Sequence, residues 1–248
     1  MGLPRTQADA AAGLAGGARF GAAFLRRHAG RLLLLFGGLL LPLWGFAELA
    51  DEVAEGEPFD FDEPLLLFAQ SIANDGYDCV FGFFSLVGYA WGVVPADIVL
   101  VLALAAFRRV REAVFAAVAL AGSGLLNVAA KQAFSRDRPS LWESIAPETT
   151  YSFPSGHAMG SMTLALVLVL LAWPTRRRLP VVVAMAVFVP MVGLSRVYLG
   201  VHYPSDIVAG WAAASIWVVG TYLMVFRGRG VRPWRSRQPA AAQLPPEG

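Results

Sequence analysis

Three short segments of this 248-residue sequence carry side chains suited to binding an anion and moving protons. The first runs from Lys131 to Pro139 and holds two cations seven residues apart, Lys131 and Arg138. Seven residues make about two helical turns, so both cations would lie on one face if the helix persists. A guanidinium offers a planar fork to phosphate oxygens, and an ammonium offers a compact charge. The alternative is that these side chains only snorkel to lipid headgroups.

The second segment is Phe153-Pro154-Ser155-Gly156-His157. Gly156 permits backbone geometry that other residues resist, and the N–H groups at a helix N-terminus form an anion site. The Ser155 hydroxyl adds one more donor. Because histidine titrates near neutral pH, His157 is placed to protonate a leaving oxygen. The alternative is an ordinary turn with an N-cap.

The third segment runs from Ser195-Arg196 to His202 and Asp206. Pro204 suits the first turn of a helix, which predicts His202 just outside the helix and Asp206 in its first turn. Asp206 then reaches back to the imidazole. Such a carboxylate fixes the tautomer and leaves the other ring nitrogen free to attack or to take a proton. Alternatively, Asp206 only complements the helix dipole.

The three segments together supply three cations, a backbone anion site, two histidines and one carboxylate, a set that fits a dianionic phosphate. No pair of carboxylates is placed for two-metal chemistry, so neither a metal nor a cofactor is expected. The single Cys79 excludes an internal disulfide and is expected to be a small buried hydrophobe.

The composition predicts that these segments are positioned by membrane helices. The chain is 56% hydrophobic and only 15% charged, against about 25% charged in soluble domains. The formal charge of +2 comes with arginines in short clumps, which argues against a nucleic-acid partner. Apolar stretches near the ~20 residues needed to cross a bilayer predict an all-α bundle of six transmembrane helices, at about 32–49, 88–107, 112–130, 158–173, 180–196 and 206–226.

Basic clusters predict which connections face the cytoplasm, where Lys and Arg are enriched. These clusters occur before the first span and at every second connection after it. They comprise Arg26, Arg27 and Arg31; Arg108, Arg109 and Arg111; Arg176, Arg177 and Arg178; and the arginines from Arg227 to Arg237. Both termini are therefore predicted inside. The connections 51–87, 131–157 and 197–205, with all three segments, are predicted outside.

The rest of the chain divides simply. Residues 1–30 are expected to be a cytoplasmic or interfacial tail, 31–226 the membrane domain and 227–248 a disordered cytoplasmic tail. The first span could instead be a signal peptide, because Ala47 to Ala50 resembles a cleavage site. Residues 64–72 suggest a helix at the membrane interface. Asp97, inside the second span, is expected to face the bundle interior, with no catalytic role.

The three segments resemble the signature of the type 2 phosphatidic acid phosphatase superfamily, integral membrane lipid phosphatases related to vanadium haloperoxidases. The resemblance covers about residues 85–226 and implies a metal-independent phosphatase with a phosphohistidine intermediate. It implies that His202 is the nucleophile, that Asp206 orients it and that His157 protonates the leaving group. It also implies a phosphoryl-binding set comprising Lys131, Arg138, Arg196, Ser155 and Gly156.

The resulting hypothesis is a multi-pass protein of the plasma (inner) membrane that hydrolyses a lipid phosphate or diphosphate at the outer face. Undecaprenyl diphosphate ranks first as substrate, then phosphatidic acid and phosphatidylglycerol phosphate. The alternatives are a vanadate-dependent peroxidase and a lipid-phosphate binder or transporter without turnover. The expected partners are the lipid substrate and the bilayer, and the sequence predicts no oligomeric state.

Overall fold

The computed structural model describes residues 29, 30 and 32–226 of the chain. The described part contains helices and no strand. The elements are η1 (Phe36–Leu40), α2 (Leu41–Glu55), α3 (Asp62–Ser71), α4 (Asp75–Val87), α5 (Val93–Ala106), α6 (Val110–Phe134), α7 (Gly156–Ala172), α8 (Arg178–Tyr198) and α9 (Pro204–Val225). The predicted all-α class is therefore confirmed for these residues.

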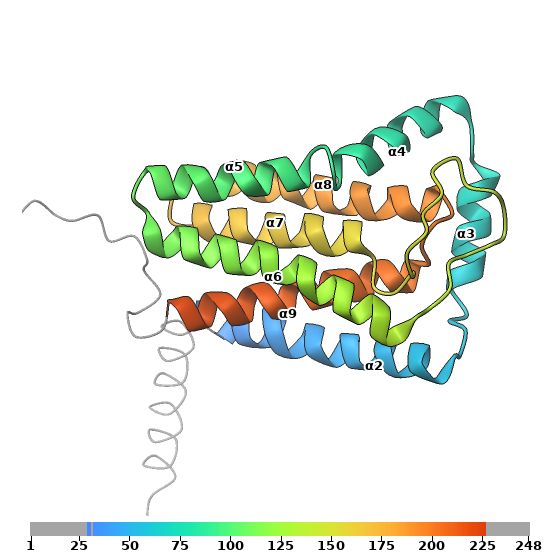
Figure 1. Ribbon diagram of the computed structural model, residues 1–248, viewed down its shortest axis with the longest axis horizontal. Coiled ribbons are helices and arrows are strands. Elements are labelled where there is room, and N and C mark those ends of the chain that lie inside the picture. The colour runs from blue at the N-terminus through green and yellow to red at the C-terminus, as the bar shows by residue number, and fades with distance from the viewer. Residues whose placement is uncertain (1–28, 31, 227–248) are drawn as a thin grey trace, which may run out of the picture.

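The long helices run side by side along the long axis of the molecule, and α3 crosses one end of them (Figure 1). Helix α7 is central, because it packs against α5, α6, α8 and α9. Its closest approach to α9 is at Gly210, where a Cβ would lie 2.8 Å from the Ser155 carbonyl oxygen. This contact brings the start of α7 against the first turns of α9.

The six predicted spans all correspond to helices. Four helices of the described part are long and apolar enough to cross a membrane, and they comprise Leu32–Glu55, Val110–Phe134, Arg178–Tyr198 and Pro204–Val225. The other two, α5 and α7, are apolar but shorter, with 14 and 17 residues. The chain is thus an integral membrane protein with about six spans.

The second span is shorter than predicted, and α4 was not predicted at all. Residues 88–92 form turns between α4 and α5. A Cβ at Gly92 would lie only 2.1 Å from the Val87 carbonyl oxygen, so this turn requires a glycine. The apolar run from residue 80 onward therefore forms two helices, and Tyr89 in the turn points toward α7.

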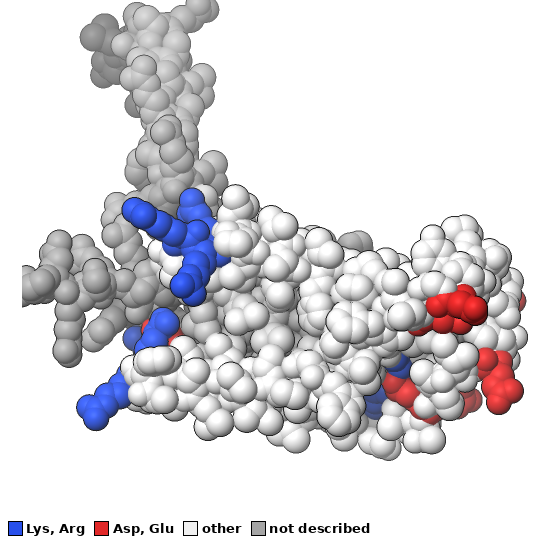
Figure 2. Space-filling view, turned by 90° about the horizontal axis from the view of Figure 1, so that it is seen from above, with Lys and Arg blue, Asp and Glu red and all other residues white. Residues whose placement is uncertain are grey.

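The charges separate along the bundle axis. Figure 2 shows basic side chains gathered at one end and acidic ones at the opposite end, where α3 lies. Helix α3 covers the helix predicted for residues 64–72 except for Ile72, which is the C-cap residue. The expectation for Cys79 was wrong, because its side chain is exposed on α4. Of the predicted tails, 1–30 and 227–248, residues 1–28 and 227–248 lie outside the described residues, and residues 29 and 30 are helical.

Candidate active site

The start of α7 is built as the sequence predicts. Ser155 is the N-cap, and its side chain accepts a hydrogen bond from the Ala158 N–H at 3.5 Å. Gly156 is the first helical residue. The preceding turn is tied to α6, since Asn127 Nδ2 donates to the Pro154 carbonyl oxygen at 3.0 Å. The free N–H groups and the helix dipole therefore point out of the end of the bundle that α3 covers.

His202 and Asp206 form a fully buried pair. Pro204 opens α9, and the Asp206 carboxylate reaches back so that Oδ2 lies 3.2 Å from His202 Nδ1. Both side chains have 0% exposure. The same Oδ2 accepts the Tyr203 N–H at 2.9 Å and the Ser152 hydroxyl. With Nδ1 protonated toward Asp206, Nε2 carries the free lone pair.

A second buried network holds Asp206 from the other side. Arg136 Nη1 donates to Asp206 Oδ1 at 2.7 Å, and Arg136 Nη2 donates to Asp62 Oδ2 at 3.0 Å. Asp62 on α3 also accepts the Ser205 backbone N–H at 2.9 Å. The guanidinium further lies over the Tyr203 ring, 4.2 Å from its centroid. This network joins α3 and the 135–155 loop to the first turn of α9.

Lys131 and Arg138 would share a helix face only if the helix continued as far as Arg138. It does not continue that far, so the two cations share no helix face. Helix α6 ends at Phe134, because Ser135 adopts a left-handed conformation with φ 47°. The two cations converge through the loop instead. Lys131 Nζ donates to Thr150 Oγ1 at 3.0 Å, and Arg138 Nη2 donates to the same oxygen at 3.0 Å.

Arg138 also faces the nucleophile candidate. Its Nη1 lies 3.2 Å from His202 Nε2 and donates to the Val201 carbonyl oxygen at 2.6 Å. A guanidinium cannot accept a hydrogen bond, so this contact agrees with an unprotonated Nε2.

Glu148 lies between the two guanidinium groups. Its Oε2 accepts from Arg138 Nη2 at 2.7 Å, and its Oε1 accepts from Arg196 Nη2. The same Oε1 is 3.8 Å from His157 Nδ1. Arg196 is buried and also donates to Ser85. A carboxylate thus occupies the position where two arginines and a histidine meet, which is a position suited to any anion.

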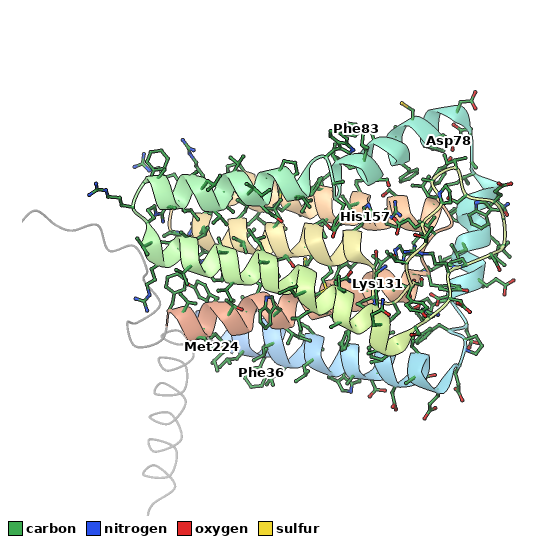
Figure 3. All side chains as sticks on the ribbon, in the orientation of Figure 1. Phe36, Asp78, Phe83, Lys131, His157 and Met224 are labelled. Atoms are coloured by element: carbon green, nitrogen blue, oxygen red, sulfur yellow. The ribbon has the colours of Figure 1, made fainter. Side chains whose placement is uncertain are left out.

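The His157 side chain is partly open, with 16% of it exposed. The Tyr89 ring lies beside its imidazole with centroids 5.1 Å apart. Figure 3 shows Lys131 and His157 toward the same end of the bundle, on the neighbouring helices α6 and α7.

Burial and charge set the pKa values of the groups outside the helices. Burial lowers the pKa of His202 to about 4, against the opposing effect of Asp206, so the imidazole is neutral at physiological pH. Burial raises the pKa of Glu148, but the neighbouring Arg196 and Arg138 outweigh it and hold that pKa below its ordinary value. The site at neutral pH therefore combines an unprotonated imidazole with an ionised Glu148.

All eight residues singled out in the sequence lie at this end of the bundle, and they comprise Lys131, Arg138, Ser155, Gly156, His157, Arg196, His202 and Asp206. Sequence reasoning missed Glu148, Ser152 and Asp62. Arg136 is a basic residue in a connection predicted to face outward, where such residues are unusual. That anomaly was the one signal available, because Glu148 and Ser152 lie in a loop without periodicity.

Comparisons with known proteins point to one family. The family model described as the PAP2 superfamily matches residues 112–229. The decaprenylphosphoryl-5-phosphoribose phosphatase of Mycobacterium tuberculosis is 36% identical over 155 residues, covering 61% of this chain and 76% of that protein. Phosphatidylglycerophosphatase B of Bacillus subtilis is 29% identical over 128 residues. That match spans 48% of this chain and 61% of the relative, which is less than two thirds of its length.

Among solved structures, the transmembrane PAP2 type phosphatidylglycerolphosphate phosphatase from Bacillus subtilis shares the fold. Its TM-score is 0.63 at 23% identity, and the alignment covers 77% of this chain and 98% of that one. The fold is that of an all-helical membrane protein. The chain belongs to the PAP2 superfamily.

Proposed function

We propose that this protein is a membrane lipid phosphatase that transfers the phosphoryl group of its substrate to His202 and then to water. The observation that carries the proposal is the His202 imidazole, with Nδ1 on Asp206 and Nε2 beside the Arg138 guanidinium. That arrangement supplies a neutral, oriented nucleophile next to a cation that binds phosphate oxygens.

In the first step the Nε2 lone pair of His202 attacks phosphorus, and the bond from phosphorus to the leaving oxygen breaks. His157, in its protonated form, gives its proton to that oxygen. The Nδ1 proton stays hydrogen-bonded to Asp206, which stabilises the cationic phosphohistidine. In the second step His157 takes a proton from water, the resulting hydroxide attacks phosphorus, and the phosphorus–nitrogen bond breaks.

The cations hold the three phosphoryl oxygens and offset their charge in the transition state. Arg138 and Arg196 each contribute a planar guanidinium, and Lys131 adds the compact charge of its ammonium group. The α7 N-terminus, with Ser155 and Gly156, adds backbone donors. In this proposal the phosphoryl group takes the place of the Glu148 carboxylate, which accepts hydrogen bonds from both arginines.

The proposed substrates are lipid phosphates or diphosphates at the outer face of the plasma membrane. The charge separation of Figure 2 supports this orientation, since the end near the exposed cluster Arg176–Arg178 is basic and the site end is acidic. Both termini are then cytoplasmic.

The test of the reaction is phosphate release by the full-length protein in detergent from a panel of phosphatidic acid, phosphatidylglycerol phosphate and undecaprenyl diphosphate. Wild-type protein is expected to release phosphate from at least one, and His202→Ala from none. Acid quenching should trap a labelled, acid-labile phosphohistidine in the wild type. Lipid binding without hydrolysis would overturn the proposal.

The test of the orientation uses single cysteines in a Cys79→Ser background. Glu57→Cys lies at the acidic end and Thr175→Cys at the basic end, and both positions are exposed. A membrane-impermeant maleimide added to intact cells should label Glu57→Cys alone. Labelling of Thr175→Cys alone would invert the proposed topology.

A further inference from the structure

A cavity of about 90 Å³ lies between α5, α6 and α7. It adjoins the active site, because Gly156 lines it next to His157, and Tyr89 lines it while its ring lies beside the His157 imidazole. On α6 the lining runs from Leu120 to Asn127, about 10 Å along the helix axis. Asn127 is one turn before Lys131. The cavity therefore extends from the active site toward the middle of the bundle.

The cavity is lined in part by polar side chains from α5, α6 and α7, although it lies among membrane helices. Its polar lining side chains comprise Asp97, Ser123, Asn127 and Thr163. The Ser123 and Thr163 hydroxyls bond each other at 2.8 Å, and Asn127 donates to Pro154. Asp97 differs, because its buried Oδ1 has no hydrogen-bond partner among the described residues.

Asp97 lies on the inward face of α5. Val93 and Leu104, one turn before it and two turns after it, are both buried, while the neighbouring Ile98 and Val99 are exposed. An unsatisfied carboxylate oxygen among apolar helices destabilises the protein. A bound donor that pairs with it removes that cost.

We propose that this cavity receives the few atoms of the substrate nearest to the leaving oxygen, and that Asp97 accepts a hydrogen bond from a hydroxyl group there. The inference rests on the proposed function, in which the phosphoryl group lies at Arg138 and Arg196 and the leaving oxygen lies at His157. The leaving group then extends past His157, where Gly156 and Tyr89 open into the cavity.

The chemistry of Asp97 selects among the candidate lipids. A carboxylate accepts hydrogen bonds from hydroxyls, as acidic residues do from ribose in dinucleotide sites. Phosphatidylglycerol phosphate and a lipid-linked phosphoribose both carry a free hydroxyl close to the phosphate ester. The glycerol of phosphatidic acid has no free hydroxyl, and the undecaprenyl phosphate that leaves from undecaprenyl diphosphate carries no alcohol hydroxyl either. The favoured substrates are therefore phosphate esters of polyols linked to lipid.

The experiment compares two substrates on two proteins, all full-length in detergent. One substrate is phosphatidylglycerol phosphate, and the other is its analogue with 1,3-propanediol in place of the terminal glycerol, which lacks only the hydroxyl. Wild-type kcat/KM should be about 10- to 100-fold higher for the hydroxylated lipid. In Asp97→Ala the kcat/KM values for the two lipids should agree within about threefold. Asp97→Asn should keep part of the preference, because its side chain still has a hydrogen-bond acceptor.

Equal kcat/KM for the two lipids on the wild-type protein would overturn the inference, even if the Asp97 variants failed to fold. An unchanged preference in Asp97→Ala would overturn it as well. These outcomes differ from failure of the proposed function, in which the wild-type protein releases no phosphate from any lipid of the panel. Hydrolysis that depends on His202 but ignores the hydroxyl would leave the proposed function standing and remove only this inference.

Discussion

Arg136 Nη1 donates a 2.7 Å hydrogen bond to Asp206 Oδ1, so the carboxylate that orients His202 is itself held by a guanidinium from a different part of the chain. Through Nη2 the same guanidinium binds Asp62 on α3. The orientation of His202 therefore depends on a chain of contacts that begins on the helix crossing the end of the bundle.

Replacing Arg136 by Ala should reduce both stability and activity. The change leaves two buried carboxylates near Ser205 without their cation, a loss that typically costs about 3–5 kcal/mol. We expect a clearly lower melting temperature and a drop in kcat of about 10- to 100-fold, with partial recovery in Arg136→Lys. Thermal unfolding and phosphate release measure the two effects.

The matched control for Arg136 is Arg176→Ala, which removes an exposed arginine at the opposite end of the bundle. It should leave both measurements unchanged. Wild-type activity in Arg136→Ala would show that Asp206 needs no support from this network.

Replacing Asp206 by Asn should lower kcat by about 10³- to 10⁴-fold while substrate binding persists. The Asn amide is neutral, so the hydrogen bond from Nδ1 no longer ends on a negative charge. The cationic phosphohistidine therefore loses its electrostatic stabilisation. Steady-state kinetics on the preferred lipid measure the change. A loss confined to KM would instead assign Asp206 to substrate binding.

Replacing Glu148 by Gln should tighten the binding of inorganic phosphate. The carboxylate accepts hydrogen bonds from Arg138 and Arg196 and so competes with any anion for both guanidiniums. Removing its charge is expected to lower the inhibition constant of inorganic phosphate about 10-fold. Glu143→Gln, exposed in the same loop, is the control and should not change it. Weaker phosphate binding in Glu148→Gln would show that Glu148 positions the arginines and does not compete for them.

The imidazole of His202 should remain neutral down to about pH 5. Burial lowers its pKa to about 4, and protonation below that pH removes the lone pair needed for attack. An NMR titration of histidine-labelled protein should show a midpoint near pH 4 for the signal that disappears in His202→Gln. Asp206 raises this pKa, so Asp206→Asn should lower the midpoint further. A midpoint near the ordinary histidine value would contradict a buried, neutral nucleophile.

The sequence predicted the helices well where short-range rules apply. Apolar stretches marked all six spans, and Pro204 correctly predicted the start of α9 and the position of Asp206 within reach of His202. The sequence did not predict α4, and it placed residues 88–92 in the second span although they form a turn. Hydropathy alone does not show where an apolar stretch is broken by a tight turn.

The sequence by itself determined the membrane class and the residue types of the site, because hydropathy and motif spacing are local properties. The tertiary structure decided how Arg136 and Arg138 are used, since α6 ends at Ser135 and the loop that follows carries both arginines toward α9. It alone placed Glu148 between two arginines and Asp97 in a cavity beside His157. These contacts join residues far apart in the chain, and no sequence period encodes where an irregular loop returns.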